Sequence, residues 1–428
     1  MGDKDMGISS YFRSGGAVAA LAIGLAGASQ VSAQELEYWV YSDFAQGDAL
    51  ALQKEFIAEF EQSHPGVRIT ITGKGDDDLT AGQIAGAASG TLPDVFMNAP
   101  GVGAQLVSVG ALDNIYDKWM AMPQDYRDQF DAGAIETCQP APETMYCIPY
   151  TGFGSLVFRN LEVLRQAGID TTEPPATWAE WFEQMKVVKE AGFYAIPDES
   201  LVFNSVAAMY AIVGAPEEWG IDWDSKTTRI SPEAMARAMQ MFVDMKPYDS
   251  GTSRNDQASK DLFISNQLAF HETGPWVDPT YRQAKADSGL DYDFVLVPGL
   301  EPGQHGGIKS YEIIGVAPGE NSQVAFEFAA HVAEKNQMLR WAKLLSRYNA
   351  NAAAMADPEV ADLPLIAISV EAAQHAYDTM PPYFVQPVPS CYSSTVIDYA
   401  SAAADGEMSP EEAAAEMIDE LNACLQEG

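Results

Sequence analysis

An aromatic ring is held on a glycine-proline step in the stretch NQLAFHETGPWVD, residues 266–278. Trp276 follows Gly274 and Pro275, and polar side chains flank the step on both sides. Such a ring is either a core residue at a strand end or a surface presented to a ligand. The stretch is therefore a candidate ligand contact.

Polar and aromatic residues also follow two predicted strands. The run LEYWVYSDF predicts a first strand, VRITITG a second and PDVFMNAPG a third, and amphipathic helical patterns separate them. This order predicts a parallel sheet, beyond whose carboxyl ends ligands bind. Residues 41–46 and 98–101 are then expected to face one crevice. The candidates there are Tyr41, Asp43, Phe44, Gln46 and Asn98.

Each of these residues also has a structural alternative. Tyr41 and Phe44 could instead cap the core of the sheet, and Asn98 could cap the helix that follows Gly101. His271, in the tryptophan stretch, is either a ligand contact or a hydrogen-bonded structural histidine.

An anionic ligand would need positive partners, which are scarce in this chain. Lys309 follows a glycine-rich loop, with Ser310 and Tyr311 beside it as further candidates, and Arg347 follows a predicted helix. The helix that begins near Asp48 offers unpaired N–H groups at its amino end. An acidic or sulfonated sugar glycoside, or a glycerol phosphodiester, is thus an alternative ligand, although most Lys and Arg side chains are simply solvated.

The charge of the chain disfavours several classes of protein. The 428 residues carry 61 acidic and 24 basic side chains, a formal net charge of −37. Such a surface repels nucleic acids and anionic membranes, so we expect neither as a partner. We expect a soluble monomer with more than one compact domain.

The first 33 residues resemble a secretory signal peptide. Lys4 and Arg13 precede the apolar run GGAVAALAIGLAGA, and Val31-Ser32-Ala33 has the small-x-small form of a cleavage site. We expect cleavage after Ala33, export to the periplasm and no transmembrane segment.

The four cysteines agree with export. Three pairings are open, and we favour Cys138 with Cys147 and Cys391 with Cys424, because the first pair closes a short loop and the second fastens the C-terminal segment. Zinc is the rival interpretation, but neither a C-x₂-C spacing nor a histidine cluster accompanies these thiols. We therefore expect no metal.

Further elements are predicted downstream. A helix follows Thr177 as its cap, and YDFVLVPG predicts a strand that enters the loop EPGQHGGIKSY. A strand at IIGVAP, a helix over 322–346 and a final helix opened by Ser409-Pro410-Glu411-Glu412 complete the chain.

The order of these landmarks resembles the family 1 extracellular solute-binding proteins, the maltose-binding-protein-like receptors of bacterial ABC importers. The resemblance rests on FIAEFEQSHPGVRITI, SGTLPDVFMNAPG with GALDNIYD after it, YCIPYTGFGSLVFRN, GIDTTEPPATWAEW, LAFHETGPW and AFEFAAHVAEKNQMLRWAKL. These segments span most of residues 36–345 in the family order. The chain departs from the family pattern near SRYNANAAAMADP, where many relatives have a Gly-x-Pro turn.

The resemblance implies an α/β fold of the two-lobed periplasmic-binding-protein type (type II-like), with the ligand cleft between lobes joined by crossover strands. Lobe one would comprise residues 34–151 plus 300–354, and lobe two residues 152–299 plus 355–428. Trp276 matches a position at which the family places a stacking ring. The first crossover would contain Tyr150, Thr151 and Phe153, and a segment bordering the pocket would contain Tyr383 and Tyr392. The structural alternative, packing in the core or at a turn, applies to Phe153, Tyr383 and Tyr392.

The resemblance implies a periplasmic receptor that closes on a carbohydrate and delivers it to a membrane permease, without enzymatic activity or a cofactor. A secreted glycoside hydrolase is the rival class, with Asp43 or Glu272 as weakly specified carboxylates. The sequence has neither a G-x-S-x-G elbow nor an H-E-x-x-H pair. The acidic run GKGDDDL is expected to be a solvated turn, with Ca²⁺ binding a minor option. An adhesive or structural protein would not need a crevice lined by loops.

Overall fold

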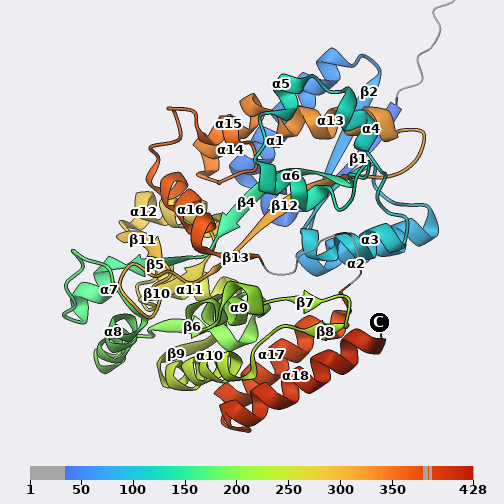
Figure 1. Cartoon of the computed structure of the whole chain (residues 1–428). Helices are drawn as coiled ribbons and strands as arrows, with labels where there is room; N and C mark the ends of the chain where they lie inside the picture. Colours follow the sequence, from blue (N-terminus) through green and yellow to red (C-terminus); the bar gives the residue numbers. More distant parts are fainter. Residues whose placement is uncertain (1–33, 379–383, 385–387, 428) are drawn as a thin grey trace, which may run out of the picture.

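The computed structural model describes residues 34–378, 384 and 388–427, so the expected signal peptide and Tyr383 lie outside the described residues. Figure 1 shows two groups of elements, one around β1, β2 and β12 and one around β5, β6 and β9, with β4 between them. Within the described ranges, no helix is long and apolar enough to cross a membrane.

The first sheet has the order β13-β12-β3-β1-β2, with β4 also paired to β12. Its strands are β1 (Gln34–Tyr41), β2 (Val67–Lys74), β3 (Val95–Asn98), β4 (Cys147–Gly154), β12 (Ile308–Val316) and β13 (Tyr377–Asp378). Strand β1 runs parallel to β2 and β3, as the alternation of strands and helices predicts. Strand β12 runs antiparallel to β3 and β4.

Helices pack against this sheet. Helix α13 contacts β12, β4 and α1, while α2 contacts β1. The helical elements on this side are η1 (Ser42–Ala45), α1 (Gly47–Ser63), α2 (Asp76–Ser89), η2 (Pro100–Val102), α3 (Gly103–Ser108), α4 (Tyr116–Ala121), α5 (Gln124–Arg127), α6 (Ala132–Cys138), α13 (Ser322–Ala333), α14 (Lys335–Leu345) and α15 (Ala352–Met355).

The second group is built on short strands. These are β5 (Leu156–Asn160), β10 (Phe270–Thr273) and β11 (Tyr292–Leu296) in the order β10-β5-β11, with β6 (Ile196–Asp198) paired to β9 (Asp249–Ser253) and β7 (Ile221–Asp222) paired to β8 (Thr227–Thr228). The helical elements are α7 (Leu161–Gln166), α8 (Trp178–Glu190), η3 (Glu199–Leu201), α9 (Phe203–Val213), η4 (Pro216–Glu218), α10 (Pro232–Met245), η5 (Lys246–Tyr248), α11 (Gln257–Ile264), η6 (Pro275–Val277), α12 (Asp278–Ser288), α16 (Pro364–His375), α17 (Ser390–Ala404) and α18 (Pro410–Glu427).

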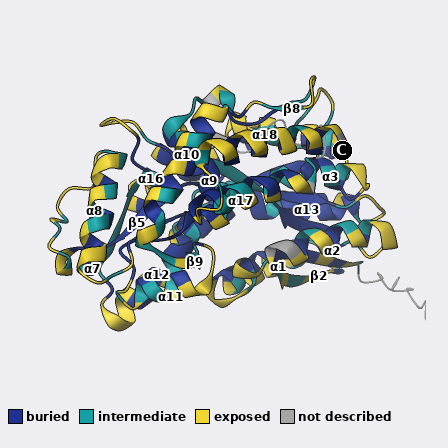
Figure 2. Cartoon of the chain, turned by 90° about the horizontal axis from the view of Figure 1, so that it is seen from below, coloured by how far each residue is buried: buried dark blue, intermediate teal, exposed yellow. Residues whose placement is uncertain are grey.

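Buried apolar residues form three clusters. The first takes its members from residues 36–150, 313–366 and 384, and the second from residues 157–308 and 392–425. A smaller third cluster lies around Phe158 and Tyr281, with Trp276 packed at its margin. Figure 2 shows α13 buried along most of its length, whereas α7 and α8 expose their outer faces.

The predicted helix starts at Thr177 and Ser409 are confirmed. The Thr177 hydroxyl accepts from the Glu180 N–H at 3.2 Å. The Ser409 hydroxyl accepts from the Glu412 N–H at 3.2 Å, and the Glu412 carboxylate accepts from the backbone and hydroxyl of Ser409, which completes the capping box.

Three element predictions are wrong. The acidic run GKGDDDL is not a turn, because β2 extends to Lys74 and α2 begins at Asp76. The helix expected over 322–346 breaks at Glu334, whose backbone is extended, and the amide of Gln129 accepts from the Lys335 N–H at 2.9 Å. The glycine-rich loop is also shorter than expected, because β12 already begins at Ile308. Lys309, Ser310 and Tyr311 therefore lie on a strand rather than in the loop.

The favoured cysteine pairing is present. Cys138 of α6 is bonded to Cys147 of β4, with Cα atoms 5.1 Å apart, and Cys391 of α17 to Cys424 of α18, with Cα atoms 6.3 Å apart. These bonds account for all four cysteines, so zinc ligation by thiols is excluded.

Candidate functional site

The carboxyl ends of the parallel strands β1 and β3 lie beside the β4–β12 pair. Strands β1 and β3 are parallel, so Tyr41 and Asn98 end at the same edge of the sheet. Asn98 also lies opposite Ile313, in the middle of β12. The residues that follow β1 and β3 therefore adjoin β12.

The second group presents its carboxyl ends to the same place. Strands β6 and β9 are parallel, and a parallel bridge between Tyr194 and Leu268 aligns β10 with β6. Thr273, at the end of β10, lies opposite Leu156, where β5 begins. Only Ser155 separates Leu156 from the end of β4. Ligands in such sheets bind beyond the carboxyl ends, so the crossover formed by β4 and β12 is the candidate site.

Trp276 is half-buried beside this crossover. Its ring meets Phe153 of β4 edge to face, with centroids 5.0 Å apart and planes at 87°. The ring folds back over Gly274, where a Cβ would lie 1.9 Å from Cζ3 of the indole. Only glycine at 274 leaves room for the ring in this position, which explains the glycine-proline step.

Two tyrosines form a second aromatic pair on the crossover. The hydroxyls of Tyr311 on β12 and Tyr348 lie 3.1 Å apart. Both rings rest on Gly152 of β4, where a Cβ would come within 3.0 Å of each. Tyr348 was not among the predicted contacts, because it meets Tyr311 only through the pairing of β4 with β12 and the bridge between Thr151 and Asn349.

A buried arginine links the segment that follows β1 to strand β12. The Arg347 side chain is 7% exposed and pairs with Asp43, which is 47% exposed, and with Glu312 at 3.4 Å. Its guanidinium also lies 4.5 Å from the centroid of the Phe44 ring. Glu312 sits at a register shift in β12 and accepts from the Thr151 hydroxyl. The predicted residues Asp43, Thr151 and Arg347 therefore form one network, through Glu312.

The remaining predicted residues near the strand ends have different environments. The Tyr41 hydroxyl donates to the Asn98 side chain at 3.4 Å. Asn98 is buried and also bonds Gln83, Thr80 and the Ala99 N–H, so it supports Tyr41 and does not cap the helix that follows Gly101. Gln46 is exposed, and Lys309 and Ser310 are half-buried on β12.

Three predicted contact residues are core residues in this structure. Phe44 packs on Trp341 with centroids 5.2 Å apart, and Tyr150 is fully buried in the same cluster. Tyr392 is buried in the second cluster, where its hydroxyl lies 3.1 Å from that of Thr228. These rings offer almost no surface to a ligand, and the packing alternative holds for Phe44 and Tyr392.

His271 is a structural histidine. It is fully buried, with Nδ1 2.5 Å from the Tyr281 hydroxyl and Nε2 2.8 Å from the Arg254 carbonyl. Burial lowers the pKa of His271 to about 3, so the ring is neutral. Both nitrogens are occupied, and none is left for a ligand.

Besides Asp198, which pairs with Lys246, three buried charged residues lie at the carboxyl ends of β6, β9 and β10. Glu199 follows β6, Arg254 follows β9, and Glu272 is the penultimate residue of β10. Each is at most 2% exposed, and Arg254 pairs with Glu272. Apart from Glu272, no sequence pattern indicated them, since charged residues are normally expected at the surface.

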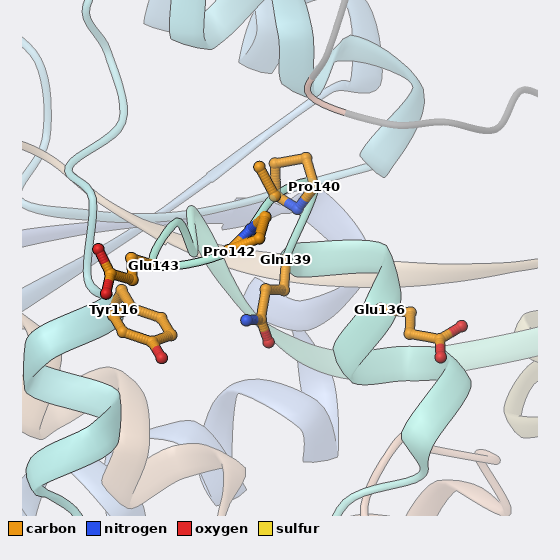
Figure 3. A pocket seen from close by; sticks show the side chains of 7 residues that line it. Tyr116, Glu136, Gln139, Pro140, Pro142 and Glu143 are labelled. Atoms are coloured by element: carbon orange, nitrogen blue, oxygen red, sulfur yellow. The ribbon is translucent and has the colours of Figure 1, made fainter.

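The described residues do not assemble a metal centre, because no group of three His, Cys, Asp or Glu side chains within these ranges is arranged to hold an ion. A hollow of 640 Å³ lies at the end of α6 (Figure 3). Its wall consists of residues 116, 136 and 139–143, beside the Cys138–Cys147 bond. It contains none of the residues of the candidate site.

Known proteins resemble this chain in sequence and fold. The profile of the bacterial extracellular solute-binding protein family matches residues 55–368. Curated relatives include the sn-glycerol-3-phosphate-binding periplasmic proteins UgpB of Agrobacterium fabrum, 26% identical over 164 residues (38% of this chain and 37% of the relative), and Brucella abortus, 28% identical over 176 residues (40% of each). The match thus spans about two fifths of the length of these relatives.

Solved structures share the fold over nearly the whole chain. The GacH receptor of Streptomyces glaucescens, studied unliganded and with acarbose, has 20% identity and a TM-score of 0.78, covering 92% of this chain and 99% of the receptor. A solute-binding protein of Thermotoga lettingae bound with α-D-tagatose has 17% identity and a TM-score of 0.79, covering 92% and 100%. The maltotriose-binding protein of Thermus thermophilus has 18% identity and a TM-score of 0.74, covering 91% and 99%. At these identities the similarity establishes the two-lobed periplasmic-binding-protein fold and nothing further.

Proposed function

The chain belongs to the bacterial extracellular solute-binding protein family, and we propose that it is the periplasmic receptor of an ABC importer for a carbohydrate. The ligand would be a mono- or disaccharide or a glycoside, held at the β4–β12 crossover and passed to a membrane permease. The family binds substrates rather than transforming them, so the proposed role is not enzymatic.

The observation that carries this proposal is the juxtaposition of Trp276 and Phe153 with polar groups on β12. Half-buried rings beside hydroxyls and carboxylates match a sugar, whose C–H face stacks while its hydroxyls bond. The proposed polar contacts beside the first sheet are the Tyr311 and Tyr348 hydroxyls and the Asp43 carboxylate. Several similar structures were solved with sugars or acarbose, which supports the same ligand class.

We propose the division into lobe one, 34–151 plus 300–354, and lobe two, 152–299 plus 355–428. The first two apolar clusters support it, because their members fall largely on opposite sides of these boundaries. Binding would close the lobes, and the closed form would dock on the permease as a monomer. Small-angle scattering tests closure, since a confirmed ligand should lower the radius of gyration.

An anionic glycoside or glycerol phosphodiester is the second candidate. The UgpB relatives favour it, as does Lys309, for which no ion pair is found within the described residues. The two buried arginines of the site weigh against it. Arg347 is paired with two carboxylates and Arg254 with one, so neither is free to neutralise a phosphate.

A thermal-shift screen tests the proposed function. Neutral hexoses, maltose, glycerol 3-phosphate and a sulfonated glycoside are each added to the mature protein, and a sugar should raise the Tm without being consumed. Trp276→Ala should weaken binding by about 30-fold or more, the typical cost of losing a central aromatic contact. Trp223→Ala, which removes another half-buried tryptophan beside the β7–β8 pair, is the matched control.

The outcomes separate the alternatives. A rise in Tm with glycerol 3-phosphate alone would favour the anionic candidate. If the protein hydrolyses a glycoside and changing one carboxylate abolishes this activity, the protein is an enzyme rather than a receptor. Equal loss of binding in both tryptophan variants would mean that stability, rather than contact, explains the effect.

A further inference from the structure

The buried charges at the carboxyl ends of β6, β9 and β10 carry a further inference, which rests on the proposed function. Glu199, Arg254 and Glu272 come from three parallel strands that end at one edge, and Trp276 extends from this same edge four residues after Glu272. The cluster therefore adjoins the proposed stacking ring.

The cluster has more negative than positive groups. Arg254 pairs with Glu272 through Nη1, while its Nε has no hydrogen-bond partner in the described structure. Glu199 is 2% exposed, and both of its carboxylate oxygens are buried without a hydrogen-bond partner of normal geometry among the described residues. Oε1 of Glu272 and the Thr273 hydroxyl are in the same condition. Four residues with unused polar atoms thus gather at one strand edge.

A purely structural cluster would not be built this way. Leaving a buried polar atom unpaired costs about 1–3 kcal/mol, and more for a charged group. Two carboxylates against one guanidinium also leave one negative charge in a region without solvent. The neighbouring Lys246 does not cancel it, because it already pairs with Asp198 and Asp405 and lies near Asp249.

Burial and the charge of Glu272 favour a proton on Glu199 in the absence of a ligand, and such a proton removes this charge. Burial, and next the negative charge of Glu272, raise the pKa of Glu199 well above its ordinary value, against the opposing effects of Arg254 and Ser205. Asp198 raises it further. His271 is neutral and supplies no positive charge. The proton can be exchanged for a cation of the ligand.

We propose that the ligand is a sugar or polyol carrying a protonated amine, and that its ammonium group binds between Glu199 and Glu272. The ammonium donates to the unused oxygens of both carboxylates, and Glu199 gives its proton to the solvent. One positive charge enters and one proton leaves, so the site stays neutral. Neighbouring hydroxyls of the same ligand reach the Arg254 Nε–H and the Thr273 hydroxyl.

The test uses matched pairs of ligands on the mature protein. Isothermal titration at about pH 6, where a sugar amine is protonated, compares glucose with glucosamine, galactose with galactosamine and mannose with mannosamine, together with the three N-acetyl derivatives. The amine should tighten binding by about 10- to 100-fold over its neutral counterpart, the gain of a charge-assisted hydrogen bond. The N-acetyl derivatives, which lack the charge, should not show this gain.

Proton exchange gives a readout that a structural role would not move. In two buffers with different ionisation enthalpies, the amine should release about one proton per molecule bound and the neutral sugar none. Glu199→Gln should abolish both the preference for the amine and the proton release. Glu190→Gln, at an exposed glutamate of α8, should keep both.

Each outcome decides something. Neutral sugars that bind as tightly as their amines overturn the inference and leave the proposed function standing. If no sugar of either kind binds while glycerol 3-phosphate does, the proposed carbohydrate function itself fails. If Glu199→Gln still prefers the amine, the ammonium group binds elsewhere, and the assignment of its site to Glu199 and Glu272 is refuted.

Discussion

Gly274→Ala should displace the stacking ring without removing it. The backbone at 274 has φ −101°, which alanine adopts without strain, so the substitution acts only through its new methyl group. That Cβ would lie 1.9 Å from Cζ3 and 2.4 Å from Cε3 and Cη2 of Trp276. Ordinary contacts between carbon atoms are about 3.5–4.0 Å, so the indole must move by roughly 1.5 Å or change rotamer.

The displacement has two measurable costs. Overpacking costs about 1–3 kcal/mol of unfolding free energy, part of which is the lost edge-to-face contact with Phe153. Sugar affinity should fall by about 30-fold, nearly as much as in Trp276→Ala, because the ring no longer lies where the sugar stacks. Titration calorimetry with the best ligand of the screen measures the affinity, and urea denaturation measures the stability.

Gly75→Ala is the matched control. The backbone at 75 also has negative φ, and an added Cβ would meet only Asp78 Oδ2, at 3.9 Å. It should bind the sugar like the unsubstituted protein. Unchanged sugar affinity in Gly274→Ala, with the stability loss observed, would show that the ring moves but does not contact the ligand, and the reasoning about Trp276 would be refuted.

Three further predictions follow from the same structure. Arg347→Met should cost about 2 kcal/mol or more in urea unfolding, because Glu312 and Asp43 lose their partner, whereas Arg165→Met at an exposed pair should leave the urea midpoint nearly unchanged. Replacing Cys391 and Cys424 with serine should cost about 3–4 kcal/mol and replacing Cys138 and Cys147 about 2–3 kcal/mol, since the pairs are 33 and 9 residues apart; a reversed order in denaturation midpoints would contradict this. His271, with its pKa lowered to about 3, should destabilise the fold as pH falls from about 6.5 toward 3, because only the unfolded state takes up its proton there; His271→Asn should flatten this part of the stability profile, and an unchanged slope would refute the assignment.

Local patterns predicted much of the fold. The parallel strands at residues 34–98, the caps at Thr177 and Ser409 and the glycine-proline step before Trp276 all depend on neighbours in sequence. The errors have non-local causes. Residues 309–311 form a strand because β4, more than 150 positions earlier, pairs with them. Likewise the 322–346 helix breaks where a distant glutamine takes the Lys335 N–H.

The candidate site was only partly predictable for the same reason. Periodicity placed Tyr41, Asp43 and Asn98 at a strand edge, but it could not distinguish Phe44, which turns into the core, from its neighbours. Glu199 and Arg254 were missed because a charged residue in an isolated stretch is assumed to be solvated. Only the alignment of three short parallel strands buries them together.

The pairing of β4 with β12 also limits how the molecule can move. These two connections form one ladder from Lys309–Gly154 to Gly315–Cys147, and the Cys138–Cys147 bond fastens one end of it. The strands of such a ladder can bend and twist together, but sliding along its length would break successive hydrogen bonds. Opening should therefore follow essentially one angular coordinate. A single pair of spin labels, one on α1 and one on α10, should report the whole cycle as two distance populations whose weights shift with ligand.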